Sequence, residues 1–391
     1  MMKYKMMITA VLLVSLAACK KDSGSDSSST STSSSSTTST STSTSSTDAY
    51  ANPGGTITGS DTYNPAVITV SGCSTTSGIS QIVCLASAFE ATLSSSQIAS
   101  LQLSYSTTTA KRWSNLPQAL VASAYQRVGL NFGSLTTTQI QYAKALIKAV
   151  AGTTTNEGWD ELQQLLNADQ YLSVNGGGSS YGAANYYIAF LGTPATTGTF
   201  EIQYGGHHTA FANTYTNGVL VGATPSFRGV EPFGTFNWNS TTNQPLQQEQ
   251  AALSAMLTGL SSTQLTTAKL SGTYSDLICG PQNDWAFPTT YSGVLCSTLT
   301  SAQQQLVLAA IATYTNDIAD NTAIMTKYTN ELSSTYIAYS GTTGLTTKND
   351  YVQINGPSVW IEYSCQNGIV LSATHPHTVW RDKSTDYGGN K

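Results

Sequence analysis

The sequence predicts an α+β fold of two pseudo-symmetric repeats, each a helical layer followed by an antiparallel β-hairpin, packed as one composite domain. Three observations predict it: a helix-start phrase that occurs four times, two strand-like blocks that each occur twice in the same order, and an Asn-Gly pair in each half. The repeat halves are expected at about residues 85–252 and 253–391.

A short phrase marks the start of each expected helix. It reads LSSSQ from Leu93, LTTTQ from Leu135, LSSTQ from Leu260 and LTSAQ from Leu299. Each copy places Gln three residues after a Ser or Thr, the pattern of a capping box, in which the two residues satisfy free backbone N–H groups. The segment after it, as in QIQYAKALIKAV, has apolar residues at helical spacing. We therefore expect a helix after each phrase.

Two strand-like blocks follow the helices in each half. YIAFLGT from Tyr187 resembles YIAYSGT from Tyr336, and NGVLVGATP from Asn217 resembles NGIVLSATH from Asn367. The members of each pair lie nearly the same distance apart, which indicates an ancient duplication. Asn-Gly between apolar alternations is the strongest short-range signal of a hairpin. Each half is therefore expected to contain an incoming strand, an Asn-Gly turn and an outgoing strand.

The N-terminus predicts export and a lipid anchor. The apolar run 6–18 follows Lys3 and Lys5 and is too short to span a bilayer, as in a signal peptide. LAAC, which ends at Cys19, resembles a bacterial lipobox, and this implies cleavage after residue 18 and lipidation of Cys19. The alternative is an ordinary secretory signal with a cysteine nearby. Lys20 favours the outer membrane of the bacterial cell envelope.

Composition sets the organisation after the signal. Residues 19–60 carry the lipidated cysteine and are rich in Ser and Thr, which make up nearly all of the segment from Lys20 to about Asp48, so we expect a flexible tether before a domain over 61–391. Charged residues make up only 9% of the chain, and 16 basic against 21 acidic residues leave no basic stripe for nucleic acid. A neutral surface with 21 tyrosines suits a small-molecule, glycan or peptide ligand.

The cysteines other than Cys19 suggest disulfides, as expected in an oxidising compartment. The simplest pairs are local, Cys73 with Cys84 and Cys279 with Cys296, although other pairings remain open. Cys365 is then left over, and a buried apolar thiol is a simpler role for it than metal binding or catalysis.

The four histidines of the chain fall in two groups. His207 and His208 precede the first Asn-Gly turn, whereas His375 and His377 follow the second, so the two segments are expected to converge between the halves. Residues two apart on a strand share a face, which places the second pair together. Only one of two neighbours joins them, and His208 is favoured because it has the strand parity of Glu362.

These residues predict a metal site. His208, His375 and His377, with Glu362 as a possible fourth ligand, suit Zn²⁺, and imidazoles also suit copper or iron. His207 is expected to support the site or face the substrate. The alternative is that the histidines form hydrogen bonds in a polar interface or contact a ligand without metal.

Charged residues gather near the histidines. TPSFRGVEP contains Arg228 and Glu231, and WRDKSTDYG contains Arg381, Asp382 and Asp386. In a chain with few charges, they are candidates for catalysis, and the equally simple alternative is ion pairing between the hairpin ends.

A further segment, KRWSNLP, offers candidate substrate-binding residues. Arg112, Trp113 and Asn115 are candidates to line a cleft. The alternative is a loop that ends a helix, with its tryptophan in the core.

Several of these motifs together resemble a known family. GGHHTAF, TPSFRGVEP, HPHTVWRDKSTDYG, RWSNLP and LTTTQ are similar to segments of DUF3500, a family of exported proteins of unknown function. The similarity covers about residues 80 to 390, and every element of its paired histidine motifs is present. The family implies no activity, so the chemistry depends on the residues themselves.

The residues favour a surface-tethered, metal-dependent enzyme, with hydrolysis as the expected reaction. A histidine-bound metal would activate water, Glu362 or Glu231 would be the general base, and Arg228 or Arg381 would stabilise developing negative charge. The alternatives are a copper or iron oxidoreductase and a non-catalytic surface lipoprotein that binds glycans or peptides. The chain lacks GxSxG, HExxH, Walker and dinucleotide signatures in a suitable context.

Overall fold

The computed structural model describes residues 62–238 and 240–390, which form a mixed α+β fold. The expected signal peptide 1–18, the lipidated Cys19 and the tether 19–60 lie outside the described residues. Among the helices of the described ranges, none has the length and apolar character needed to cross a membrane.

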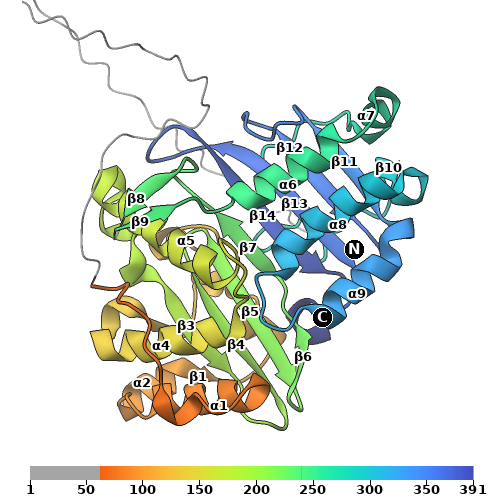
Figure 1. The fold of residues 1–391 in the computed structure, drawn as a ribbon. Coiled ribbons are helices and arrows are strands. Elements are labelled where there is room, and N and C mark those ends of the chain that lie inside the picture. The colour runs from red at the N-terminus through yellow and green to blue at the C-terminus, as the bar shows by residue number, and fades with distance from the viewer. Residues whose placement is uncertain (1–61, 239, 391) are drawn as a thin grey trace, which may run out of the picture. The chain divides into compact units, whose positions relative to one another are not determined.

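A single 12-stranded sheet runs through the described domain (Figure 1). Neighbouring strands along it pair antiparallel, except that β1 is parallel to β3. In spatial order the strands are β1 (Gln102–Leu103), β3 (Tyr187–Leu191), β4 (Thr199–Gly206), β5 (Thr209–Thr216), β7 (Ser226–Gly229), β14 (Thr374–Asp382), β13 (Val359–Asn367), β12 (Tyr351–Asn355), β11 (Tyr336–Ser340) and β10 (Val294–Leu295). Off this path, β2 (Leu130–Asn131) pairs with β3 and β6 (Val219–Gly222) pairs with β5, while β8 (Phe236–Trp238) and β9 (Thr241–Asn243) form a separate ribbon.

The pairing of β7 with β14 joins the strands of the first half of the chain to those of the second. Gly229 lies opposite His377, and Arg228 lies opposite Thr378. Because successive residues of a strand point to opposite faces, Gly229 and His377 share one face while Arg228 and Thr378 share the other. This junction therefore places different chemistry on the two sides of the sheet.

The helices begin where the repeated phrase predicts. All four capping boxes are present, with Ser94, Thr136, Ser261 and Thr300 as the N-cap residues. The helices are α1 (Gly78–Glu90), α2 (Ser95–Leu101), α3 (Thr107–Ala110), α4 (Thr137–Val150), α5 (Trp159–Leu172), α6 (Gln247–Thr258), α7 (Ser262–Ala268), α8 (Ser301–Thr315) and α9 (Thr322–Glu331). The four phrases thus start α2, α4, α7 and α8, so this prediction is confirmed.

The sheet separates two apolar cores. On the side where α4, α6 and α8 lie (Figure 1), residues such as Ile147, Met256 and Trp380 belong to the main core. The opposite face carries a smaller cluster that includes Trp113 and Val379. Long loops rather than long helices cover this second face, which is the face to which His377 points.

The strand prediction for the adjacent histidines is wrong. Gly206 pairs with Thr209, so His207 and His208 form the two-residue turn between β4 and β5. The Asn217-Gly218 turn does connect β5 to β6, but each half contributes more strands than the hairpin that was expected. The expected boundary between residues 252 and 253 falls inside α6.

One of the two expected disulfides forms. Cys73 and Cys84 are bonded, whereas Cys279, Cys296 and Cys365 are buried free thiols. Cys296 belongs to the main core on the helical side. The amide of Cys279 donates to Glu362, and Glu362 lies on the other face of the sheet because its neighbours on β13 point into the main core. The prediction of a bond between Cys279 and Cys296 is therefore wrong.

Candidate metal centre

Three imidazoles meet at the end of the β7–β14 junction. His375 and His377 lie on β14, and His208 comes from the β4–β5 turn. The Nε2 atom of His377 lies 3.2 Å from Nε2 of His375 and 3.2 Å from Nε2 of His208. All three side chains are buried, and they form one of the groups in the described chain whose ligand atoms lie close enough to hold a metal ion.

Backbone contacts fix the turn that carries His208. Its backbone has a φ of 60°, in the left-handed region, and its N–H donates to the carbonyl of Asn115 at 3.1 Å. Its own carbonyl accepts from the N–H of Gly229 at 2.8 Å. Arg127 donates to the carbonyl of Gly206, and the hydroxyl of Tyr186 donates to the backbone carbonyl of His207 at 3.0 Å. The turn is thus held from both sides.

Gly229 leaves room for two of the imidazoles. A Cβ atom at this position would lie 2.9 Å from Cδ2 of His208 and 2.9 Å from Cδ2 of His377. Such distances are shorter than ordinary carbon–carbon contacts, so any side chain here would displace both rings. The approach of His208 to His377 depends on this glycine.

His208 and His375 are expected to be neutral. Burial lowers the pKa of His208 and of His375 well below the ordinary value of 6.5, and neighbouring imidazoles lower both pKa values further. Nδ1 of His377 lies 3.1 Å from Oδ1 of Asp276, and in the tautomer that donates to this carboxylate Nε2 carries the lone pair. That one lone pair faces two other Nε2 atoms, and it cannot accept a hydrogen bond well from both.

The spacing of the nitrogens is compatible with a bound metal ion. Two nitrogens bound at about 2.0 to 2.1 Å to a tetrahedral zinc ion lie about 3.3 to 3.4 Å apart. The 3.2 Å spacings of the Nε2 atoms are close to this. The contact of Asp276 with His377 is also the outer contact that orients a metal-ligating histidine. Nδ1 of His375 is buried and has no hydrogen-bond partner among the described residues.

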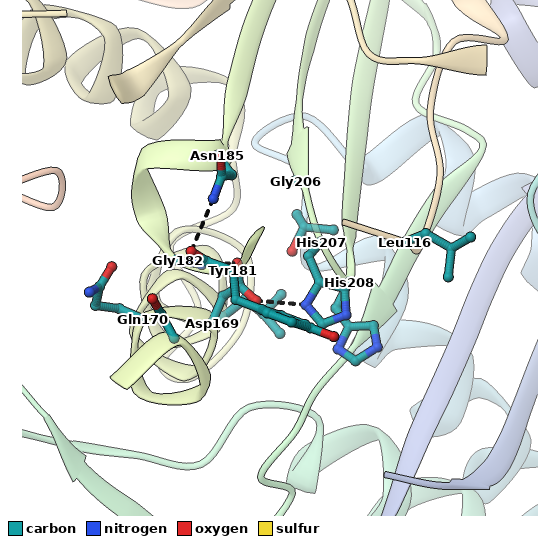
Figure 2. Close-up of polar contacts among 12 residues, drawn as sticks. Leu116, Asp169, Gln170, Tyr181, Gly182, Asn185, Gly206, His207 and His208 are labelled. Carbon is teal, nitrogen blue, oxygen red and sulfur yellow. Dashed lines mark hydrogen bonds and ion pairs between the residues drawn. The ribbon is translucent and has the colours of Figure 1, made fainter. Parts of the chain in front are cut away.

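His207 is not one of the three clustered ligands and pairs with Asp169 of α5. Its Nδ1 lies 2.6 Å from Oδ1 of Asp169, and its ring stacks on His208 with centroids 3.7 Å apart. The ring of Tyr181 meets it edge-on, with centroids 4.8 Å apart. Figure 2 shows these side chains together, with Asp169 on the side of His207 away from His208. The pair forms an oriented imidazole beside the candidate metal centre.

Glu362 is not brought into the histidine cluster. Its carboxylate accepts hydrogen bonds from the backbone of Ile278 and Cys279 and from the side chains of Tyr351 and Trp360. Burial raises the pKa of Glu362 above its ordinary value, and the hydrogen bonds from these donors offset only part of the rise. With four donors on two oxygens, Glu362 anchors the loop that crosses this face.

Arg381, Asp382 and Asp386 form a separate cluster. At about 3.3 Å per residue, Arg381 lies roughly 13 Å farther along β14 than His377. Its guanidinium donates to Asp386 and to Asp284 at 3.0 Å each, while Asp382 accepts from Lys327 and other neighbours. The structure therefore favours the ion-pair interpretation of these three residues.

Arg228 and Glu231 belong to the same segment, TPSFRGVEP, but their side chains lie apart. Arg228 points to the helical side of the sheet, where it pairs with Glu161 and Asp317. Glu231 is buried beyond Gly229, and its Oε1 accepts from the backbone N–H of Leu371. Neither residue is one of the clustered ligands.

The segment 112–115 reaches the site only through its backbone. Arg112 donates to the carbonyls of Gln126 and Ser123. Trp113 is buried in the second core and donates to the hydroxyl of Tyr387. Asn115 contributes the carbonyl that accepts from His208. The alternative of a core tryptophan is confirmed.

Sequence reasoning missed Asp169, Asp276, Tyr181 and Gly229. Asp169 and Asp276 lie far along the chain from the histidines that they contact, and no local pattern marks them. Gly229 was noted only as part of a motif. Nothing in the sequence around Gly229 indicated that this residue lies opposite His377.

Comparison with known proteins places this chain in a family. A family model described as a protein of unknown function (DUF3500) matches residues 75–389, which contain every residue of the site. The chain belongs to the DUF3500 family. No curated protein and no solved structure matches it. The resemblance inferred from the paired histidine motifs is confirmed, and DUF3500 membership by its description assigns no activity.

Proposed function

We propose that this DUF3500 protein is a metal-dependent hydrolase in which His208, His375 and His377 hold a divalent ion, with zinc favoured. The observation that carries the proposal is that the buried Nε2 atom of His377 lies 3.2 Å from Nε2 of His208 and 3.2 Å from Nε2 of His375, while the ligand atoms of all three lie within 4.8 Å of one another. Three histidine ligands leave one tetrahedral position for water or substrate, as in catalytic zinc sites.

The bound ion would supply a water molecule whose pKa is near neutrality. His207 would move the proton, since Asp169 holds its Nδ1 and leaves Nε2 for the reaction. This assignment replaces Glu362 and Glu231 as the general base, because their oxygens accept hydrogen bonds from elsewhere in the chain. Tyr181, half-buried against the His207 ring, is a candidate to contact the substrate.

We also propose that the two halves are repeats related by duplication. The strand order β3-β4-β5-β7 is followed by β14-β13-β12-β11, which is the corresponding order reversed. In each half, the Gln residues of two capping boxes bond to each other, Gln97 to Gln139 and Gln264 to Gln303. The histidines would then occupy the interface between repeats, where ligand sites are common.

The lipid anchor at Cys19 remains part of the proposal. LAAC and the Ser/Thr-rich segment after it support a domain tethered to the bacterial outer membrane. Labelling with a radioactive fatty acid, with Cys19→Ala as the control, tests this step.

Metal analysis of the purified protein tests the proposed centre. We expect about one zinc ion per chain in the wild type and loss of most of it in His208→Ala and His375→Ala. His207→Ala is the matched control, because it removes an imidazole that is not a ligand, and it is expected to retain the metal but lose hydrolysis. Absence of metal from the wild type, or equal metal in all variants, would contradict the proposal.

Two further outcomes separate the alternatives. A copper or iron signal in electron paramagnetic resonance, with zinc absent, would favour an oxidoreductase. Saturable binding of a glycan or peptide that survives chelation and loss of the histidines would favour a non-catalytic binding protein.

A further inference from the structure

A second group of ionisable residues lies on the helical side of the sheet. Glu157 precedes α5, Glu161 lies on α5, Glu249 lies on α6 and Asp317 follows α8. All four are buried around Arg228 of β7. Because Arg228 and Gly229 point to opposite faces, the sheet separates this group from the histidines.

Two of the carboxylates contact Arg228 directly. Glu161 accepts from Arg228 at 3.2 Å and from the amide of Leu246 at 3.1 Å. Asp317 accepts from Arg228 at 3.1 Å and from the amide of Gly158 at 2.8 Å. Arg228, which carries the single guanidinium of the group, is thus paired with Glu161 and Asp317.

Glu249 has no such partner. It is only 1% exposed, and neither of its oxygens accepts a hydrogen bond from another residue in the described part of the chain. Oε2 of Glu157 is also buried without a partner. Glu157, Glu249 and Asp317 each direct a carboxylate oxygen to one place, and these oxygens lie within 4.8 Å of one another.

The charges of the group do not balance. Four carboxylates face one guanidinium, and the desolvation of an unpaired buried carboxylate is costly. The group must therefore hold extra protons or a cation.

We propose that Glu157, Glu249 and Asp317 bind a hard divalent cation, with Ca²⁺ as the favoured ion. An all-oxygen carboxylate set suits Ca²⁺ or Mg²⁺ rather than zinc. Mg²⁺ usually keeps several of its waters, whereas Ca²⁺ accepts a set of protein oxygens with flexible geometry. The two unpartnered oxygens of Glu249 can bind Ca²⁺ together.

The position of this site gives it a structural role. Its ligands come from the segment before α5, from α6 and from the end of α8, so the ion would tie elements from both halves of the chain. The ion would stabilise the folded protein by an amount that rises with the logarithm of its concentration above the Kd.

Thermal unfolding of EDTA-treated full-length protein, with and without Ca²⁺, tests the inference. We expect the wild-type Tm to rise by about 3 to 5 °C when Ca²⁺ exceeds its Kd about a hundredfold. Glu249→Gln is expected to abolish the rise. Glu90→Gln is the control, since Glu90 also has an unpartnered buried oxygen but lies on α1 outside the group, and it should preserve the rise.

Further variants keep the test decisive. Glu157→Gln should also abolish the rise, and it serves if Glu249→Gln does not fold. His375→Ala should keep the full response to Ca²⁺, which separates this site from the proposed zinc centre. If the wild-type Tm does not change and equilibrium dialysis shows no bound Ca²⁺, the inference is overturned. The carboxylates would then be neutralised by protons instead of a cation. An undiminished rise in both glutamate variants would also overturn it.

Discussion

Gly229 occupies the closest approach between the two histidine segments. Its absent side chain is what allows His208 and His377 to meet, since a Cβ would lie 2.9 Å from both rings. A glycine in a strand often marks such an approach, and here the approaching groups are two candidate ligands.

We predict that Gly229→Ala weakens metal binding by about tenfold or more while the domain stays folded, because displaced ligands lose their geometry. Zinc affinity measured by competition with a chromogenic chelator, together with circular dichroism, checks this. Gly344→Ala is the control, since a Cβ at this position would lie 3.7 Å or more from its neighbours and its backbone is unstrained. Equal zinc affinity in both variants would show that the rings can shift without loss.

At this scale the sequence predicted the histidine trio correctly, but from an incorrect premise. His208 was chosen by strand parity, yet it lies in a turn with a left-handed backbone. His375 and His377 do share a face of β14, as their spacing requires. The contacts of Asp169 and Asp276 were beyond prediction, because a distant pairing leaves no local periodicity.

The helix starts show what local chemistry can specify. A capping box depends on residues three positions apart, so all the information lies within one phrase. Each of the four boxes forms, although the helices that follow differ in length from α2 to α8. By contrast, two-residue strands such as β1 and β10 exist only through their neighbours, and the sequence did not reveal them.

We predict that Thr136→Ala lowers the free energy of unfolding by about 1 kcal/mol, because the N-cap hydroxyl accepts from the Gln139 amide. Urea unfolding measures the change. Thr137→Ala, one residue later on an exposed position, is the matched control and should change stability little. A loss of the same size in both variants would assign the effect to something other than the cap.

At the scale of the molecule, a buried carboxyl group in the sheet, that of Glu201, makes the free energy of unfolding depend on pH. Glu201 of β4 is 1% exposed and accepts from the hydroxyl of Thr214 at 2.9 Å. Burial raises its pKa to about 7 from 4.5, and the Thr214 hydrogen bond only partly opposes this. Between these values the unfolded chain loses its proton while the folded chain keeps it.

Stability from Glu201 is therefore fully present below pH 4.5 and is lost as the pH rises through about 7. We predict that Glu201→Gln removes a pH-dependent loss of up to about 3 kcal/mol between pH 5 and pH 8. Urea unfolding at both pH values checks this, with the exposed Asp320→Asn as the control. Parallel pH profiles for Glu201→Gln and the wild type would contradict it.

The α+β class was predictable, whereas the joining of all major strands into one sheet was not. Repeated helix phrases and Asn-Gly turns indicate local units. The β7–β14 pairing joins strands that lie far apart in the sequence. Cys279 and Cys296 were expected to bond because they lie close together along the chain, and no local pattern shows that the sheet separates them.

The distance along the chain between His208 and His377, 169 residues, affects when the protein can acquire metal. During synthesis the first half of the chain emerges with His208, its one proposed ligand, and His375 and His377 follow only near the C-terminus. Until β7 pairs with β14, the chain offers at most His375 and His377 together, without His208. The full affinity of the proposed site for its metal is therefore coupled to folding. A bound ion would thus report that the whole domain has been synthesised and correctly assembled.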